Sequence, residues 1–354
     1  MRNVLLLEPN YSNKYPPIGL MKLATYHRRL GDNVVFYKGN LEQFIRDQIA
    51  TQCILKLSEI DNSINWFAHK GNISQFLKTR RKDFLEPLNL GESKFEVLLI
   101  NWIDEFKRYY TNRLYKKEPY WDRICVTTLF TFYWDITIET INFAKELVKD
   151  TRELWVGGVL ATVLKDEVEK ETGIKPWLGL LNKPGILDKN EIVIDELPLD
   201  YSILEEVEYK YSESNAYYGY TTRGCIRKCK FCAVPILEPR FNKYVALKAR
   251  IDETKRVFGE KQNLILLDNN VLASPDFNKI IKEIIKSGFI KGAEYFEPNE
   301  LEITIKNLRQ GINDNAYVKK AINLLHYLLG KTKASTQQTI YNLLYQHDLL
   351  KIET

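Results

Sequence analysis

Three cysteines stand close together in the second half of the chain, at Cys225, Cys229 and Cys232, with the spacing C-x3-C-x2-C. Arg223 and Gly224 come directly before the first of them. Three thiolates on one short loop can bind three irons of a cubic [4Fe–4S] cluster. The fourth iron then has no protein ligand and can take one from a small molecule. The spacing therefore predicts an iron–sulfur centre with one open coordination position.

Zinc and disulfide bonds are the other common uses of such cysteines. Four-thiolate zinc sites pair two C-x2-C units, but the remaining cysteines, Cys53 and Cys125, have no such partner. The next histidine after Cys232 is the distant His326. A disulfide scaffold is disfavoured because five cysteines in 354 residues are few and odd in number. We predict the cluster, with Cys53 and Cys125 filling space in the core.

The cysteine segment resembles the radical S-adenosylmethionine (radical SAM) superfamily. The resemblance rests on the cysteine spacing, on the Arg-Gly pair before Cys225 and on Phe231 before Cys232. It implies that the amino and carboxylate groups of SAM chelate the fourth iron. It also implies that an electron donor such as flavodoxin or ferredoxin drives cleavage of SAM to a 5′-deoxyadenosyl radical, which takes hydrogen from a substrate. Phe231 would pack beside the cluster and the adenine.

Basic residues surround these cysteines, namely Arg223, Arg227, Lys228 and Lys230. Positive charge near an anionic cluster should raise its reduction potential. The same residues could instead be solvated loop charges.

Composition bounds the class of protein. A chain of 354 residues that is 45% hydrophobic and 27% charged is typical of about two globular domains. The sequence contains no apolar run long enough for a membrane span or a signal peptide. We predict a cytoplasmic protein without membrane contact. The net charge of +5 is mild and does not require a nucleic acid partner.

The first half of the chain alternates between strand and helix patterns. Apolar runs at 4–7, 33–37, 124–130 and 154–156 predict strands, and apolar residues at helical spacing lie between them. Such alternation predicts a parallel sheet with helices on both faces. Residues 41–118 are instead helical in pattern and rich in Lys, Arg and aromatics. We therefore predict an α/β domain over 1–200 with a helical insert at 41–118.

Two loops of this domain resemble the cobalamin-binding-type Rossmann-like domains that precede many radical SAM domains. They are Pro16-Pro17-Ile18-Gly19-Leu20 and Gly157-Gly158-Val159-Leu160-Ala161-Thr162. The resemblance implies that Pro17, Gly19, Gly157 and Gly158 line a cofactor crevice at the carboxyl ends of the strands. A plain tight turn explains the two adjacent glycines equally well. Cobalamin stays open as a cofactor, and we expect weak binding or none because the insert can cover the crevice.

Residues 201–354 resemble a partial radical SAM (β/α) barrel. A linker at 183–214, whose acidic run Glu205–Glu208 reads as a solvated face, leads to a strand at 216–222 that carries the cysteines. A second strand is expected at 263–267, followed by Asp268, Asn269 and Asn270. Many radical SAM proteins have Gly-Gly-Glu at this point, which orients the SAM amino group. The resemblance implies that role for these three residues, and a turn or cap cluster is the alternative.

The C-terminal pattern differs from a complete barrel. At most one further strand is available, at Phe289–Phe296, and the tail at 298–354 reads as helical. A six-stranded half-barrel needs about three more strand–helix units, on the order of 100 residues. We expect the chain to be a fragment.

Three functions fit these patterns. The leading one is a [4Fe–4S] radical SAM enzyme. The second is a non-catalytic iron–sulfur binding or sensing module, motivated by the short barrel. The third is RNA modification, which the basic and aromatic insert permits. Formation of 5′-deoxyadenosine separates the first function from the second, and salt-dependent RNA binding would support the third.

Overall fold

A parallel sheet of four strands lies at the centre of the N-terminal half. The computed structural model describes residues 1–60, 66–88, 93–111, 117 and 119–329. The strands follow the order β2-β1-β3-β4, and their bounds are β1 (Asn3–Glu8), β2 (Asn33–Lys38), β3 (Arg123–Thr128) and β4 (Leu154–Gly158). The predicted α/β class with a parallel sheet is confirmed. Within the described ranges, every helix is either too short or too polar to cross a lipid bilayer.

Both faces of this sheet are buried, which explains its continuous apolar strands. In β1, Val4 and Leu6 point to one face, and Leu5 and Leu7 point to the other. The first face packs on α1 (Ile18–Arg29). The second packs on α5 (Trp134–Leu147), α6 (Val159–Val163) and α7 (Lys165–Thr172). These four residues of β1 are at most 1% exposed.

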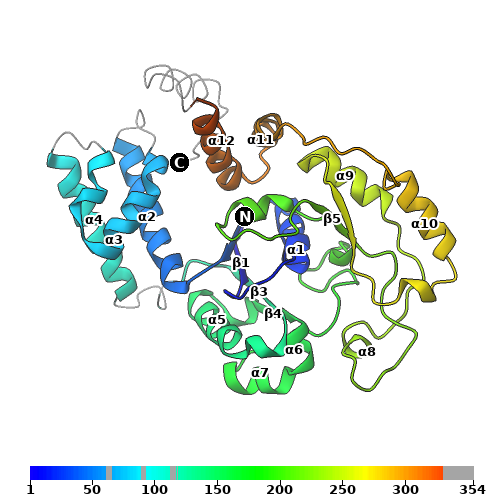
Figure 1. Ribbon diagram of the computed structural model, residues 1–354. Coiled ribbons are helices and arrows are strands. Elements are labelled where there is room, and N and C mark those ends of the chain that lie inside the picture. The colour runs from blue at the N-terminus through cyan, green and yellow to red at the C-terminus, as the bar shows by residue number, and fades with distance from the viewer. Residues whose placement is uncertain (61–65, 89–92, 112–116, 118, 330–354) are drawn as a thin grey trace.

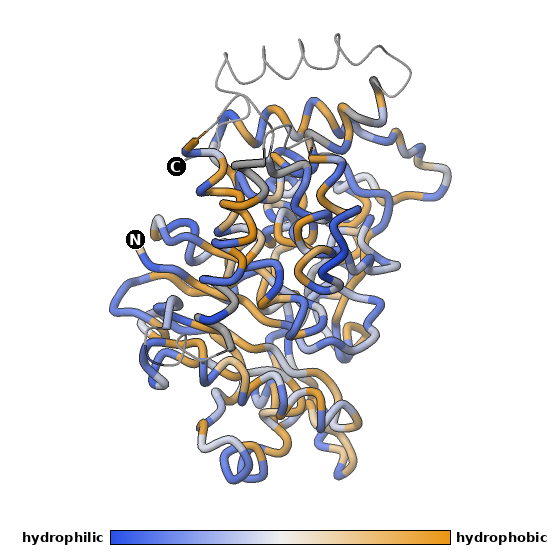
Figure 2. The backbone as a smooth tube through the Cα atoms, turned by 90° about the vertical axis from the view of Figure 1, so that its left-hand side faces the viewer, coloured by the Kyte–Doolittle hydropathy of each residue, from blue (hydrophilic) through white to orange (hydrophobic). Residues whose placement is uncertain are grey.

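The segment between β2 and β3 forms a separate helical unit. Its helices are α2 (Leu41–Ile60), α3 (Lys70–Thr79) and α4 (Ser93–Thr111). They bury a core of their own that includes Cys53, Trp66 and Leu99. Figure 1 shows this unit at one end of the molecule, with α9 (Lys248–Phe258) and α10 (Phe277–Lys286) at the opposite end. Hydrophobic and hydrophilic residues alternate along the helices in Figure 2, as expected for helices that bury one face.

A second parallel sheet, of two strands, carries the cysteine segment. It pairs β5 (Ala216–Gly219) with β6 (Asn263–Leu266). The helices α9 (Lys248–Phe258) and α10 (Phe277–Lys286) follow these strands. The further strand expected at Phe289–Phe296 does not form. Gly292 there has a left-handed φ of 81°, and Phe296 is 73% exposed, so this segment is a surface loop.

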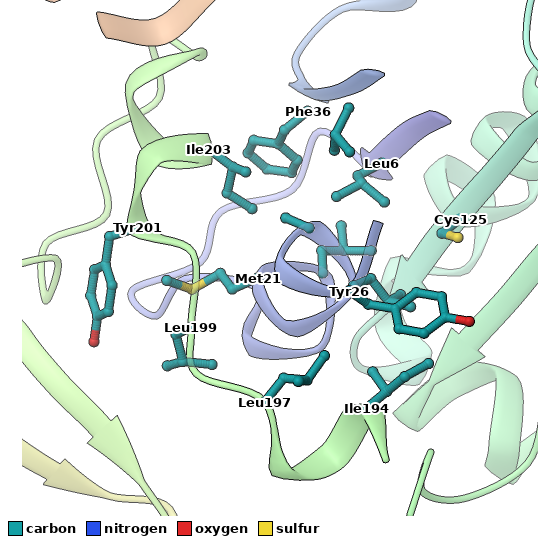
Figure 3. Packing of buried hydrophobic residues seen from close by; sticks show 14 of the residues in the cluster. Leu6, Met21, Tyr26, Phe36, Cys125, Ile194, Leu197, Leu199, Tyr201 and Ile203 are labelled. Carbon is teal, nitrogen blue, oxygen red and sulfur yellow. The ribbon is translucent and has the colours of Figure 1, made fainter. Parts of the chain in front are cut away.

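The small sheet is also covered on both faces. Tyr217 and Leu266 pack against α9 on one face. Ala216 and Tyr218 join the core of α1 on the other face, together with apolar residues of the linker. Figure 3 shows α1 between Leu6 and Phe36 of the large sheet and Leu197 and Leu199 of the linker. The two halves of the chain therefore share one core through α1.

One carboxylate of the acidic run, Glu206, is buried, which corrects the expected solvated face at this position, whereas Glu208 is exposed. Glu206 accepts hydrogen bonds from the Arg28 guanidinium (3.3 Å), the Phe36 N–H (2.7 Å) and the Asn313 amide (2.7 Å). Burial raises the pKa of its carboxyl group to about 7. Asn313 precedes α12 (Asp314–Leu329), which packs on α11 (Glu300–Arg309) and on the linker turn η8 (Tyr201–Glu205). Residues 330–354 of the predicted tail lie outside the described residues.

Candidate metal centre: the cysteine loop

The cysteine loop, residues 224–241, begins shortly after the carboxyl end of β5. Its base is closed by a backbone pair between Arg223 and Asn242, with N–H···O distances of 3.0 and 2.8 Å. The short helix α8 (Val234–Leu237) lies within the loop and packs against α6 of the N-terminal half. The predicted position of the loop, after the first strand of the second sheet, is confirmed.

Gly224 stands where the two ends of the loop cross. Its φ is +70°, and a Cβ atom there would lie 2.5 Å from the Arg240 carbonyl oxygen and 2.9 Å from that of Glu238. Only glycine accommodates both the left-handed backbone and the close approach. The crossing of the two chain segments therefore requires a glycine directly before Cys225.

Asp268, the second residue after the end of β6, holds the segment that leads into the loop. One of its carboxylate oxygens accepts from the Thr221 hydroxyl (2.8 Å), the Thr222 N–H (2.5 Å) and the Thr222 hydroxyl (2.6 Å). The other accepts from the Thr221 N–H at 3.0 Å. Both threonines are fully buried. The carboxylate assigned by resemblance to the SAM ammonium therefore faces the protein's own backbone.

The next two residues also contact the loop. Asn269 donates its amide N–H to the Glu238 carboxylate at 3.0 Å, and Asn270 donates to the Cys225 sulfur at 3.5 Å. Because β5 and β6 are parallel neighbours, their carboxyl ends bring Asp268–Asn270 beside the cysteine loop. The sequence predicted this juxtaposition, but not the individual partners.

Cys225 has the chemistry of a metal ligand. Its sulfur accepts hydrogen bonds from the Arg227 N–H (3.4 Å) and from the Asn270 amide. These donors, the Arg227 N–H above all, hold the pKa of the Cys225 thiol below its ordinary value. A lowered pKa favours the thiolate, which is the form that binds metals.

The buried cysteines differ sharply from this one. Cys53 and Cys125 are at most 1% exposed. Burial raises the pKa of each of these thiols to about 12. They behave as small apolar residues of two different cores.

The sulfurs of the loop are free and half-exposed. The Cys232 N–H donates to the Cys229 carbonyl at 3.1 Å, which turns the chain between these two residues. Within the described residues, no three His, Cys, Asp or Glu side chains converge closely enough to hold a metal ion. Three free thiols on one loop are chemically suitable ligands for an iron–sulfur cluster, but the three sulfurs are not gathered around a common point.

The charges and the aromatic residue of the loop divide into buried and exposed groups. Arg223 is only 10% exposed in its side chain and is ion-paired with Asp195 and Glu238, so it is not a solvated loop charge. Arg227, Lys228 and Lys230 are exposed. Phe231 is 93% exposed, so the structure does not show the packing expected beside a cluster and adenine. The loop tip is therefore both basic and apolar.

Contacts within the chain explain Gly158, one of the glycines of the N-terminal half. Gly158 has a φ of +108°, and a Cβ there would lie 2.2 Å from the Thr128 carbonyl oxygen of β3. The Thr128 hydroxyl donates to the Gly157 carbonyl at 3.0 Å. These contacts support the tight-turn interpretation. Pro17 directly precedes α1, and Gly19 lies in its first turn with open space where a Cβ would be.

The carboxyl edge of β1 and β2 is filled by the protein itself. Glu8 and Lys38 form a fully buried ion pair at 3.0 Å. The rings of Tyr11, Tyr209 and Tyr211 surround the Lys38 ammonium at 4.8, 4.1 and 5.1 Å, and the Tyr211 hydroxyl donates to Glu8. Open α/β sheets bind their ligands at this edge. The filled edge gives cobalamin no support, and no function is derived from it.

The basic cluster of the helical insert is partly neutralised. Arg80 pairs with Asp104 at 2.9 Å, and Arg81 pairs with Asp83 at 2.6 Å. Fewer uncompensated charges weaken the case for an RNA-binding face on this unit.

Comparison with known proteins shows a similarity over a third of the chain. The ribosomal protein uS12 methylthiotransferase RimO of Aquifex aeolicus (strain VF5) is 29% identical over 126 residues, which cover 33% of this chain and 26% of that protein. The chain thus spans about a quarter of the relative's length. No family model matches the chain. No solved structure matches it either.

Proposed function

We propose that the chain is an iron–sulfur protein of the radical SAM type, with Cys225, Cys229 and Cys232 as ligands of a [4Fe–4S] cluster that binds SAM at its fourth iron. The observation that carries the proposal is the position of three free cysteines at the carboxyl end of β5, with two N–H donors directed at the Cys225 sulfur. The similarity to a methylthiotransferase supports an enzyme of this kind at a coarse level.

The residues around the loop have separate tasks in this proposal. A reduced cluster held by these cysteines would supply one electron to SAM, and the sulfur–carbon bond of SAM would then break to give methionine and a 5′-deoxyadenosyl radical. Asp268 fixes the start of the loop, and the Asn270 amide stabilises negative charge on Cys225. Hydrogen bonds to cluster sulfurs and nearby positive charge both raise the reduction potential. Phe231, exposed beside Cys232, is available to cover the adenine.

The same loop tip is the proposed docking point for an electron donor. Arg227, Lys228 and Lys230 are exposed there, next to the exposed side chains of Ile226 (58%) and Phe231 (93%). A basic rim around an apolar centre complements an acidic redox protein of the flavodoxin or ferredoxin kind. Docking at this tip would bring the donor next to the cysteines.

A cluster-binding module without SAM cleavage is the second candidate. The face of β5 and β6 that would line the interior of a barrel packs instead on α1 and the linker, through Tyr218 and Ala216. Substrate and SAM in a barrel-type enzyme need open space at the carboxyl ends of the strands. The filled face therefore favours a structural or sensing role as the alternative.

Formation of 5′-deoxyadenosine distinguishes the two candidates. Anaerobically reconstituted protein should produce it from SAM in the presence of dithionite. Cys229→Ala should abolish the product, whereas Cys53→Ala, a matched change at a buried cysteine, should retain it. A reconstituted wild-type cluster that yields no 5′-deoxyadenosine would exclude the enzyme and favour the binding module.

A further inference from the structure

Four charged side chains of alternating sign connect the N-terminal half to the cysteine loop. Lys22 of α1 donates to the Asp195 carboxylate at 2.7 Å. Asp195, in the linker turn η7 (Ile194–Glu196), accepts from the Arg223 guanidinium at 3.1 Å. A second guanidinium nitrogen of Arg223 lies 2.9 Å from the Glu238 carboxylate. We name Lys22, Asp195, Arg223 and Glu238 the loop latch.

The loop latch is largely removed from water. The exposed fractions of its side chains are 9% for Lys22, 20% for Asp195 and 10% each for Arg223 and Glu238. The Arg223 guanidinium also lies 3.9 Å from the centre of the Tyr220 ring. Charges shielded in this way are tolerated only with partners. Two cations and two anions alternate here, so loss of one member leaves its neighbours uncompensated.

Glu238 extends the latch to both ends of the loop. Its carboxylate accepts from the Gly224 N–H at 2.6 Å and from the Asn269 amide at 3.0 Å. Gly224 is the first residue of the loop, and Glu238 follows α8 near the end of the loop. One carboxylate thus ties the two crossing chain segments together, and Arg223 connects that carboxylate to the linker.

We propose that Arg223 is a positioning residue through which the N-terminal half fixes the cysteine loop, by the route Lys22–Asp195–Arg223–Glu238. The packing of α6 on α8 gives the N-terminal half a second contact with the same loop. The proposed function explains why such fixation matters, because three sulfurs on a loose loop pay a large entropic cost to gather around a cluster. The latch itself is a property of the metal-free chain.

Hydrogen exchange in the full-length, metal-free chain tests the latch directly. The Arg223, Gly224 and Asn242 N–H groups are all bonded at the base of the loop. Asp195→Asn should accelerate their exchange about tenfold, as expected for the loss of a charge-assisted hydrogen bond. Exchange in β1 and β2 should stay unchanged. Asp195→Glu, which keeps the charge, should restore much of the protection.

Glu205→Gln is the matched control. Glu205 also lies in the linker and pairs with a lysine, but this lysine, Lys320 at 2.8 Å, belongs to α12 and not to the latch. It should leave exchange at the loop base unchanged. If Asp195→Asn does not fold, Glu238→Gln provides the second variant, with the same acceleration expected at Arg223 and Asn242.

Wild-type exchange rates in both latch variants would overturn the inference, as would equal acceleration in Glu205→Gln. Since the measurement uses metal-free protein, it is independent of the proposed function. Selective acceleration in a protein that binds no iron would support the latch and reject the cluster. Unchanged exchange in a protein that binds iron would reject the latch and support the cluster.

Discussion

Replacement of Asp268 should loosen the cysteine loop and destabilise the fold. In Asp268→Ala, the N–H groups of Thr221 and Thr222 lose their acceptor in a place where both residues are fully buried. An unsatisfied buried donor costs about 1–3 kcal/mol, so two of them predict a loss of about 3 kcal/mol in unfolding free energy after partial hydration. For a chain of 354 residues, a loss of this size corresponds to a fall in Tm of about 4 °C.

Urea and thermal unfolding of the metal-free protein measure this change. Asp268→Asn keeps the size and one acceptor oxygen, so it should lose about half as much stability. Asp252→Ala is the surface control, since Asp252 is 56% exposed and pairs with the exposed Lys248, and its change should stay within about 0.5 kcal/mol. The reasoning is refuted if Asp268→Ala is as stable as Asp252→Ala. Intact stability together with weakened SAM affinity would restore the role of SAM ligand to Asp268.

The remaining predictions concern thiols, glycines, pH and cobalamin. Iodoacetamide should modify Cys225, Cys229 and Cys232 in the folded metal-free chain but not Cys53 or Cys125, whose thiols have pKa values of about 12 through burial; peptide mass spectrometry reads the pattern, and labelling of Cys125 without denaturant would contradict it. Gly224→Ala should cost about 2 kcal/mol more in urea unfolding than Gly31→Ala, because both have a left-handed φ (+70° and +75°) but only the first brings a Cβ within 2.5 Å of a carbonyl oxygen; equal losses would argue against the crossing. The pKa of Glu206, about 7 in the fold, lies above its unfolded value, so this carboxyl stabilises the protein at low pH and loses that contribution as the pH rises through 7. Between pH 5 and 8, wild type should therefore lose about 2 kcal/mol relative to Glu206→Gln in urea unfolding, and parallel pH profiles would reject the assignment. Titration with aquocobalamin should give no sub-micromolar binding, because Lys38 and its three tyrosines fill the edge of the sheet; tight binding would mean that these rings move aside.

The sequence predicted the features that depend on local pattern. The apolar run at Val4–Leu7 could only be a strand buried on both faces, and β1 is such a strand. The position of the cysteine loop followed from the strand before it, and the position of Asp268–Asn270 followed from the next parallel strand. These inferences need only the geometry of neighbouring elements.

Features that depend on distant partners were not predictable. Glu206 read as a solvated residue in an acidic run, yet Arg28, Phe36 and Asn313 meet it from three elements. Asp268 was assigned to a ligand because nothing local showed that Thr221 and Thr222 would point their donors at it.

Two further features were missed for related reasons. Phe289–Phe296 has the composition of a strand, but Gly292 turns the chain there. Lys22 gave the one available signal for the loop latch, because a lysine stands among the apolar residues of α1 and must find a buried counter-charge.

The most direct test of the central claim is the metal and sulfide content of the anaerobically reconstituted protein. The three cysteines of the loop predict about four irons and four sulfides per chain, lost in Cys225→Ala and retained in Cys125→Ala. Stoichiometric zinc without sulfide, or iron that survives the loss of Cys225, would contradict the account.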